Sequence, residues 1–312
     1  MQTSKILITG SLGLIGSALE RQLSILGVNV QGIDLRYPTN HPRYGSICDL
    51  DKLTRLAQGC TGIVHLAAVS RVITGEQHPD SCWDVNVSGT QTVLEVAKRS
   101  PSKPWIIYAS SREVYGQQSQ LSVNESALLL PCNIYARSKV AAEELINKYR
   151  RNGLQTAIMR FSNVYGSTGD HKDRVIPAFC KAAACGVSIR IDGGHNTFDF
   201  THIDDVIDGI QKVINKLQQG CFELPAIHLT TGKGTNLLEA ANLAKSASKF
   251  DIKFIDNPSR SFDVSTFYGD PMLAKSLLNW QAKTSINEGI VLLVRMFEYE
   301  NIKNNTRVSS VI

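Results

Sequence analysis

Short apolar runs alternate with amphipathic stretches through the first half of the chain. Runs at residues 5–9, 28–34, 62–67, 105–110 and 156–161 predict buried strands. Between them, apolar positions at helical spacing predict helices over residues 14–26, 51–58, 83–99 and 134–151. This alternation favours an α/β fold with a doubly wound parallel sheet of the Rossmann type, in which right-handed crossovers place helices on both faces.

The second half of the chain is less regular. It predicts helices over residues 174–185, 204–216, 237–248 and 271–278, separated by short strand-like pieces. We therefore expect residues 1–165 to form the first domain, with residues 196–225 returning to it. Residues 166–195 and 226–300 are expected to form a smaller α/β lobe that binds substrate, and the polar tail at 301–312 is expected to fray.

The composition narrows the class of protein. With 43% hydrophobic and 20% charged residues in a chain of 312, it is that of an ordinary globular protein. The apolar runs are too short to cross a membrane and leave no room for a signal peptide, so we expect a soluble, cytoplasmic protein with no membrane partner. The net charge of +5 is spread along the chain, which argues against nucleic-acid binding. The seven cysteines form no C-x-x-C pair, so we predict neither a metal site nor a disulfide framework.

A glycine-rich turn joins the first predicted strand to the first predicted helix. Gly10, Gly13 and Gly16 would let the backbone approach a pyrophosphate at the helix N-terminus. Asp34 ends the next predicted strand, where a carboxylate can bind the hydroxyls of an adenosine ribose and repel a 2′-phosphate. The pattern predicts a dinucleotide site that prefers NAD to NADP, a preference that the nearby Arg36 weakens.

Tyr135 and Lys139 stand four residues apart on one predicted helix, and so share a face. An ammonium beside a phenol is expected to lower the pKa of Tyr135, which would make the phenol a usable proton donor and acceptor. By itself this spacing is also compatible with a solvated helix face.

Further motifs follow these two in order along the chain. They are D-L at 49–50, H-L-A-A at 65–68, N-V-S-G-T at 86–90, S-S-R-E-V-Y-G at 110–116, R-F-S-N-V-Y-G at 160–166 and D-F-T-H-I-D-D-V at 199–206. Together with the glycine turn, Asp34 and the Tyr135–Lys139 pair, they resemble the extended short-chain dehydrogenase/reductase family. Within that family the chain is similar to the NAD-dependent nucleotide-sugar epimerases and dehydratases.

The resemblance implies NAD as cofactor, a nucleotide-sugar substrate and a homodimer formed through the helices at 83–99 and 134–151. It implies that Ser111 hydrogen-bonds the reacting sugar oxygen, that Tyr135 is the general acid/base and that Lys139 binds the nicotinamide ribose. The residues it places around the cofactor are Gly10, Leu12, Gly13, Leu14, Ile15, Gly16, Asp34, Arg36, Asp49, Leu50, Leu66, Ala67, Ala68, Asn86, Ser110, Tyr135, Lys139 and Phe161. Those it places around the substrate are Ser111, Arg112, Asn163 and Arg260.

The reaction itself stays open at this point. An epimerase is the leading hypothesis, but Glu113 resembles the base of the dehydratases and decarboxylases and could be catalytic. Arg112 cannot protonate a leaving group because a guanidinium stays charged, yet it could bind a carboxylate, or the two could form an ordinary surface pair. Phe198 stands where sugar-nucleotide epimerases usually carry an arginine that clamps the diphosphate. A reductase that releases its cofactor and a non-catalytic NAD-binding regulatory protein remain as alternatives.

Overall fold

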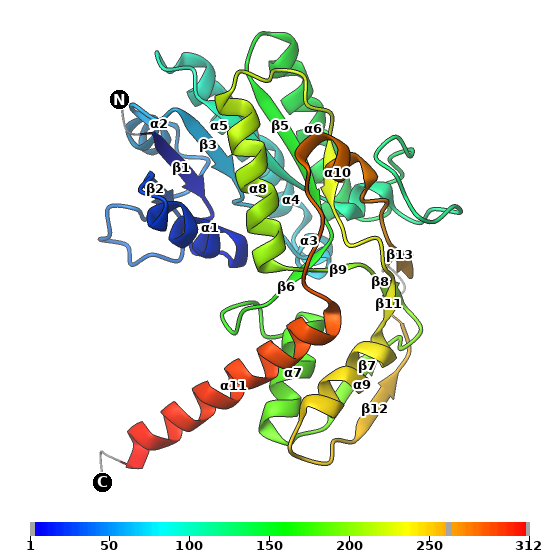
Figure 1. Cartoon of the computed structure of the whole chain (residues 1–312). Helices are drawn as coiled ribbons and strands as arrows, with labels where there is room; N and C mark the ends of the chain where they lie inside the picture. Colours follow the sequence, from blue (N-terminus) through cyan, green and yellow to red (C-terminus); the bar gives the residue numbers. More distant parts are fainter. Residues whose placement is uncertain (1–3, 260–263, 310–312) are drawn as a thin grey trace.

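The computed structural model describes residues 4–259 and 264–309 (Figure 1). A parallel sheet of six strands, in the order β10-β5-β4-β3-β1-β2, lies at the centre of the larger part. Its strands are β1 (Lys5–Thr9), β2 (Asn29–Ile33), β3 (Gly62–His65), β4 (Trp105–Ser111), β5 (Thr156–Phe161) and β10 (Ile227–Leu229). The predicted doubly wound Rossmann-type sheet is thereby confirmed.

Helices cover both faces of this sheet. On one face pack α1 (Leu14–Ile25), α8 (Ile203–Gln218) and α10 (Met272–Leu278), and on the other α2 (Leu50–Ala57), α5 (Gly89–Arg99) and α6 (Ile134–Arg151). Strand β1 shows how the sequence supports two cores, since Ile6 and Ile8 enter the first while Leu7 enters the second. Strands buried on both faces need apolar side chains at successive positions, which explains the continuous apolar runs.

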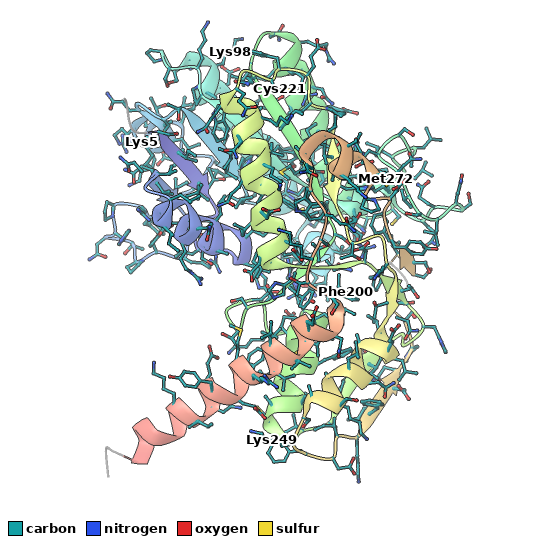
Figure 2. All side chains as sticks on the ribbon, viewed as in Figure 1. Lys5, Lys98, Phe200, Cys221, Lys249 and Met272 are labelled. Carbon is teal, nitrogen blue, oxygen red and sulfur yellow. The ribbon has the colours of Figure 1, made fainter. Side chains whose placement is uncertain are left out.

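A smaller part of the chain packs below the carboxyl ends of the strands. Its own core joins α7 (Val175–Cys185), α9 (Leu237–Ala247) and α11 (Ile286–Ser309). Small sheets complete it: β7 (Ile189–Asp192) with β12 (Phe254–Asn257), β6 (Asn163–Tyr165) with β9 (Phe200–His202), and β8 (Thr197–Phe198) between β11 (Thr235–Asn236) and β13 (Thr266–Phe267). Phe200 is buried where the two parts meet (Figure 2).

Several elements differ from the sequence predictions. The helix expected at 83–99 is divided into α4 (Pro79–Trp83), a π-helical turn η1 (Asp84–Ser88) and α5, and it is preceded by an unpredicted α3 (Val72–Gln77). The sequence predicted no helix over residues 286–309, where α11 buries a stripe that includes Ile290, Leu293 and Val294 against the lower core. The fraying of the tail at 301–312 stays a prediction.

Helix α8, from the segment 196–225 that is expected to return to the first domain, packs on the central sheet. Strand β10 also joins that sheet, although it lies within residues 226–300, which are expected to belong to the smaller lobe. The domain boundaries themselves stay a prediction. Among the helices of the described ranges, none has both the length and the apolar character needed to cross a membrane.

Candidate active site

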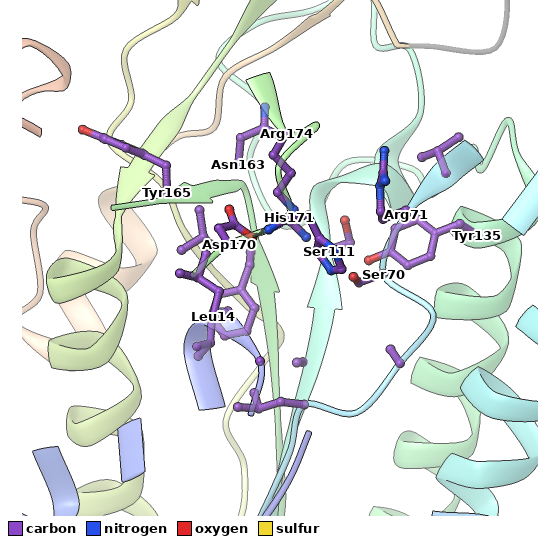
Figure 3. Close-up of a pocket in the computed structure, with 18 of the residues that line it drawn as sticks. Leu14, Ser70, Arg71, Ser111, Tyr135, Asn163, Tyr165, Asp170, His171 and Arg174 are labelled. Atoms are coloured by element: carbon purple, nitrogen blue, oxygen red, sulfur yellow. Dashed lines mark hydrogen bonds and ion pairs between the residues drawn. The ribbon is translucent and has the colours of Figure 1, made fainter. Parts of the chain in front are cut away.

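A cavity of about 1120 Å³ opens at the carboxyl edge of the sheet, between the sheet and the smaller part (Figure 3). The register brings the relevant strand ends together there, since Thr9 lies opposite His65 and Ser111 lies opposite Phe161. Ligands of open α/β sheets bind at this edge, outside the carboxyl ends of the strands.

The glycine turn forms one wall of the cavity. Gly10 has a φ of +70°, and a Cβ there would come within 2.8 Å of the Ala67 nitrogen. A Cβ on Gly16 would come within 2.2 Å of the Gly10 carbonyl oxygen, so only glycine lets the turn close on itself. No side chain caps the N-terminus of α1 at Gly13, so its N–H groups suit the pyrophosphate of a dinucleotide.

Asp34 lies at the end of β2 with its carboxylate oriented by the glycine turn. The Leu12 N–H donates to Oδ2 at 3.0 Å, and the Arg36 N–H donates to Oδ1 at 2.9 Å. The Arg36 guanidinium also contacts this carboxylate at 3.3 Å, but its side chain is half exposed. The guanidinium donates to both carboxylate oxygens, from Nε to Oδ1 and from Nη2 to Oδ2, so ribose hydroxyls bound at Asp34 would take the place of this half-exposed group.

The hydroxyls of Ser111 and Tyr135 meet at the centre of the site (Figure 3). Burial raises the pKa of Tyr135 to about 12, although hydrogen bonding with Ser111 opposes this shift. The predicted lowering of the Tyr135 pKa by Lys139 is therefore wrong as a net effect, because burial outweighs the contacts that favour the phenolate. Lys139 lies in the next turn of α6, where its Nζ donates to the Ala109 carbonyl at 2.8 Å.

Arg112 and Glu113 form a buried ion pair, not a surface one. They follow Ser111 on the short 3₁₀ turn η2 (Arg112–Tyr115), and Nη2 of Arg112 lies 2.8 Å from Oε1 of Glu113. The second oxygen of Glu113 accepts from the Asn133 side-chain amide at 3.1 Å. Both carboxylate oxygens therefore already have partners.

Most residues that the resemblance placed at the site do line the cavity. The predicted cofactor residues among them are Gly10, Gly13, Leu14, Ile15, Gly16, Asp34, Arg36, Leu66, Ala67, Ala68, Ser110, Tyr135, Lys139 and Phe161. The predicted catalytic and substrate residues among them are Ser111, Arg112, Glu113 and Asn163, while Arg260 lies outside the described residues.

Four predicted cofactor residues, Leu12, Asp49, Leu50 and Asn86, are not part of the cavity lining. Asp49 instead caps α2, accepting from the Lys52 N–H at 2.9 Å, and Leu50 is the first residue of that helix. The Asn86 side chain holds the loop after β3, because it accepts a hydrogen bond from the Val69 N–H at 2.8 Å. Asn86 thereby supports the loop whose neighbouring residues Ala68 and Ser70 line the cavity.

A charged group on the opposite wall was not predicted from the sequence. Arg71, after β3, forms an ion pair with Asp173, which belongs to the loop before α7. Asp170 of the same loop lies 3.6 Å from Arg174, and burial raises its pKa. The charge-dense run at 170–174, shortly after the motif at 160–166 that contains Asn163, was the signal available in the sequence.

Comparison with known proteins agrees with this geometry. The model of the NAD dependent epimerase/dehydratase family matches residues 6–222. A UDP-glucose 4-epimerase of Lacticaseibacillus casei is 28% identical over 304 residues, which cover 88% of this chain and 91% of that protein. The UDP-glucose 4-epimerase of Thermotoga maritima, solved with UDP-glucose, aligns with a TM-score of 0.87 at 25% identity over 95% of this chain and 99% of that one. MoeE5, solved with UDP-glucuronic acid and NAD, aligns with a TM-score of 0.85 at 25% identity over 96% and 100% of the two chains.

Proposed function

Since the chain belongs to the NAD-dependent epimerase/dehydratase family, we propose that it is a nucleotide-sugar 4-epimerase. NAD is its cofactor, and the uncapped end of α1 together with Asp34 fits that molecule. The observation that carries the proposal is the meeting of Ser111 and Tyr135 beside Lys139, with the neighbouring Glu113 already engaged on both oxygens.

Each of the three central side chains has a role in this reaction. Ser111 would hold the reacting sugar hydroxyl, and Tyr135 would remove its proton and later return it. Lys139, fixed by the Ala109 carbonyl, would hold a ribose hydroxyl of the cofactor near the tyrosine. When bound, NAD supplies a hydride acceptor that can return the hydride to the opposite face of the same carbon.

A dehydratase or decarboxylase is the second candidate, because Glu113 lines the cavity. A general base needs a free oxygen that reaches the proton it removes. Arg112 and Asn133 each hold one oxygen of Glu113 and so restrain the carboxylate in the wall of the cavity, which favours the epimerase. A non-catalytic NAD-binding protein would have no need to place Ser111, Tyr135 and Lys139 together.

Product analysis distinguishes these reactions. The protein with NAD is incubated with UDP-, dTDP-, GDP- and CDP-sugars, including uronic acids, and the products are examined by mass spectrometry and NMR. We expect a product of unchanged mass with an inverted carbon. Loss of water or carbon dioxide would move the central role to Glu113, and the absence of any product would contradict the proposed function.

Replacing the general acid/base gives a sharper prediction. Tyr135→Phe should lower turnover by roughly 10²- to 10⁴-fold, because the proton has no other carrier of the right geometry. The Kd for NAD, measured by calorimetry, should stay within about twofold of the wild-type value because the aromatic ring is kept. Tyr299→Phe, on the exposed part of α11, is the matched control. Unchanged turnover in Tyr135→Phe would refute the assignment.

We also propose that two copies pair through α5 and α6, as the family resemblance implies. These helices lie together on one face of the sheet, where they share a core. Light scattering on the purified protein should give twice the mass of one chain, and the mass of a single chain would contradict the pairing.

A further inference from the structure

Arg36 holds the carboxylate that the adenosine ribose of the cofactor needs. Its Nε donates to Oδ1 of Asp34 at 3.3 Å, and its Nη2 donates to Oδ2 at 3.4 Å. The backbone N–H groups of Arg36 and Leu12 donate to the same two oxygens. An ionised carboxylate accepts about four hydrogen bonds, so these four donors fill Asp34. Two ribose hydroxyls can bind there only after a donor has left.

The guanidinium is the donor that can leave. The Leu12 N–H belongs to the closed glycine turn, and the Arg36 N–H belongs to a loop in which Asp34 pairs with Tyr44 and donates its own N–H to the Arg43 carbonyl. The Arg36 side chain, in contrast, is 51% exposed. Its contacts of 3.3 and 3.4 Å are longer than the roughly 2.7–2.9 Å of a strong charge-assisted hydrogen bond, so displacing it costs little.

The guanidinium lies within the cofactor end of the cavity. Its Nη2 is 3.7 Å from the position that a Cβ on Gly13 would occupy, so its charge lies beside the glycine turn. Arg36 lines the cavity, whereas Arg43, the other arginine of the loop between β2 and α2, does not. Nη1 of Arg43 instead pairs with Glu20 at 2.5 Å, and its Nη2 donates to the Val30 carbonyl at 3.2 Å. Arg36 is thus the arginine of this loop that a bound dinucleotide meets.

The two common dinucleotides use this corner of the cavity differently. NAD presents two ribose hydroxyls, which donate to a carboxylate and so compete with the guanidinium. NADP presents a 2′-phosphate in place of one hydroxyl. Asp34 repels that phosphate, whereas a guanidinium donates charge-assisted hydrogen bonds to it. Moving Arg36 off Asp34 is therefore a cost in the binding of NAD and part of the attraction in the binding of NADP.

We propose that Arg36 competes with the ribose of NAD for Asp34 and binds the 2′-phosphate of NADP, so that the site accepts both dinucleotides. Asp34 gives the preference for NAD, and Arg36 reduces that preference by weakening the binding of NAD and strengthening the binding of NADP. The inference concerns the cofactor end of the cavity and does not depend on which sugar reaction the protein catalyses.

Calorimetry without a sugar substrate measures the Kd for NAD and the Kd for NADP in each variant. The wild type should bind both, and NAD more tightly. Arg36→Met should bind NAD about two- to fivefold more tightly, because Asp34 no longer has to be released from an exposed ion pair. It should bind NADP roughly 10-fold more weakly, because a charge-assisted hydrogen bond to the phosphate is lost. Arg21→Met removes an exposed arginine of α1 that does not line the cavity, and should leave both Kd values unchanged.

A second background tests whether the effect on NAD depends on Asp34. Asp34→Asn removes both the ion pair and the repulsion of the phosphate, so it should weaken the binding of NAD and strengthen that of NADP. Adding Arg36→Met to Asp34→Asn should no longer tighten the binding of NAD, because no carboxylate remains for which the guanidinium competes. Tightening that persists in this background would overturn the competition. Partial misfolding of a variant would lower the binding stoichiometry and not the Kd.

Three further results would overturn the inference. Equal weakening of both cofactors in Arg36→Met would place the arginine on a group that they share, such as the adenine or the pyrophosphate. Unchanged Kd values for both cofactors would show that the guanidinium takes no part in binding. A wild type that binds NAD but not NADP would show that Asp34 alone decides the choice. These results leave the proposed function intact, whereas a wild type that binds neither cofactor would contradict that function together with the inference.

Discussion

Lys139 is a residue whose burial opposes its charge. Burial lowers the pKa of Lys139 from its usual 10.5 to about 8, although Cys82 and Glu143 favour the charged form. At neutral pH the side chain is therefore still mostly an ammonium, held in a site that disfavours its charge. Under the proposed function, the fold retains this cost because the charged group lies where the cofactor and Tyr135 would meet.

Removing this charge should stabilise the protein without NAD. Between pH 8 and 10.5 the folded protein binds fewer protons at Lys139 than the unfolded chain does, so the wild type gains stability as the pH rises through that range. Lys139→Met lacks this titration. We expect the variant to be more stable than the wild type by about 2 kcal/mol at pH 7, with the advantage shrinking above pH 8. Urea unfolding at pH 7 and pH 10 measures the difference in free energy of unfolding between Lys139→Met and the wild type. The same difference at both pH values would contradict the explanation.

At the scale of elements, a buried polar cluster fixes α6 against the sheet. Glu143 of α6 accepts from Ser110 of β4 at 2.5 Å and pairs with the Arg160 guanidinium of β5 at 2.7 Å. Arg160 also donates to the Tyr115 hydroxyl at 3.0 Å, and that hydroxyl lies 3.2 Å from Nδ1 of His228 on β10. The helix that carries Tyr135 and Lys139 is thus tied to the strand that ends in Ser111.

Breaking this cluster should cost far more than breaking a surface pair. Arg160→Met leaves Glu143 charged and buried, and should reduce the free energy of unfolding by about 3–5 kcal/mol. Arg160→Met combined with Glu143→Leu should recover part of the loss, because no isolated charge remains. Arg99→Met removes an exposed Arg–Glu pair of α5 and should change stability by less than about 1 kcal/mol. Denaturant titration, monitored by circular dichroism, measures the free energy of unfolding of all three variants. Equal losses in Arg160→Met and Arg99→Met would contradict this explanation.

At the scale of the whole molecule, the two parts of the chain meet across the cavity. The ion pair between Arg71 and Asp173 joins the loop after β3 to the loop before α7, and both residues line the cavity. Their side chains are partly exposed, so the pair adds little to stability. It does join two loops that both contribute to the lining of the cavity.

This contact should therefore matter more for exchange of the cofactor than for folding. Arg71→Gln should leave the free energy of unfolding within about 0.5 kcal/mol and should accelerate the release of radiolabelled NAD several-fold. Lys245→Gln, which removes a surface pair with Asp251 away from the cavity, serves as the control. An unchanged release rate would show that the ion pair does not restrain the loops.

The sequence predicted features that depend on neighbouring positions. The glycine turn, Asp34 and the spacing of Tyr135 and Lys139 are local, so their placement around the cavity was predictable. The ion pair of Arg71 with Asp173 and the contact of Arg112 with Phe198 join distant segments, and no periodicity encodes such pairs.

Two elements were missed for different reasons. Helix α11 was detectable, since its buried positions fall at helical spacing, but its polar end hid the pattern. The π-helical turn η1 was not detectable from the sequence. It accommodates the hydrogen bonds of Asn86 with Val69 and Ser138, which are distant along the chain.

The chain leaves the central sheet and returns to it before it ends, and this order limits how such proteins can diversify. The smaller part draws on three separate segments, α7 with β7, α9 with β12, and α11, while β10 and α10 between them belong with the sheet. No single junction would transplant the smaller part of one relative onto the sheet of another. We expect new substrate preferences in proteins of this architecture to arise by single replacements at the cavity wall, at positions such as 112 and 198, and not by shuffling of modules.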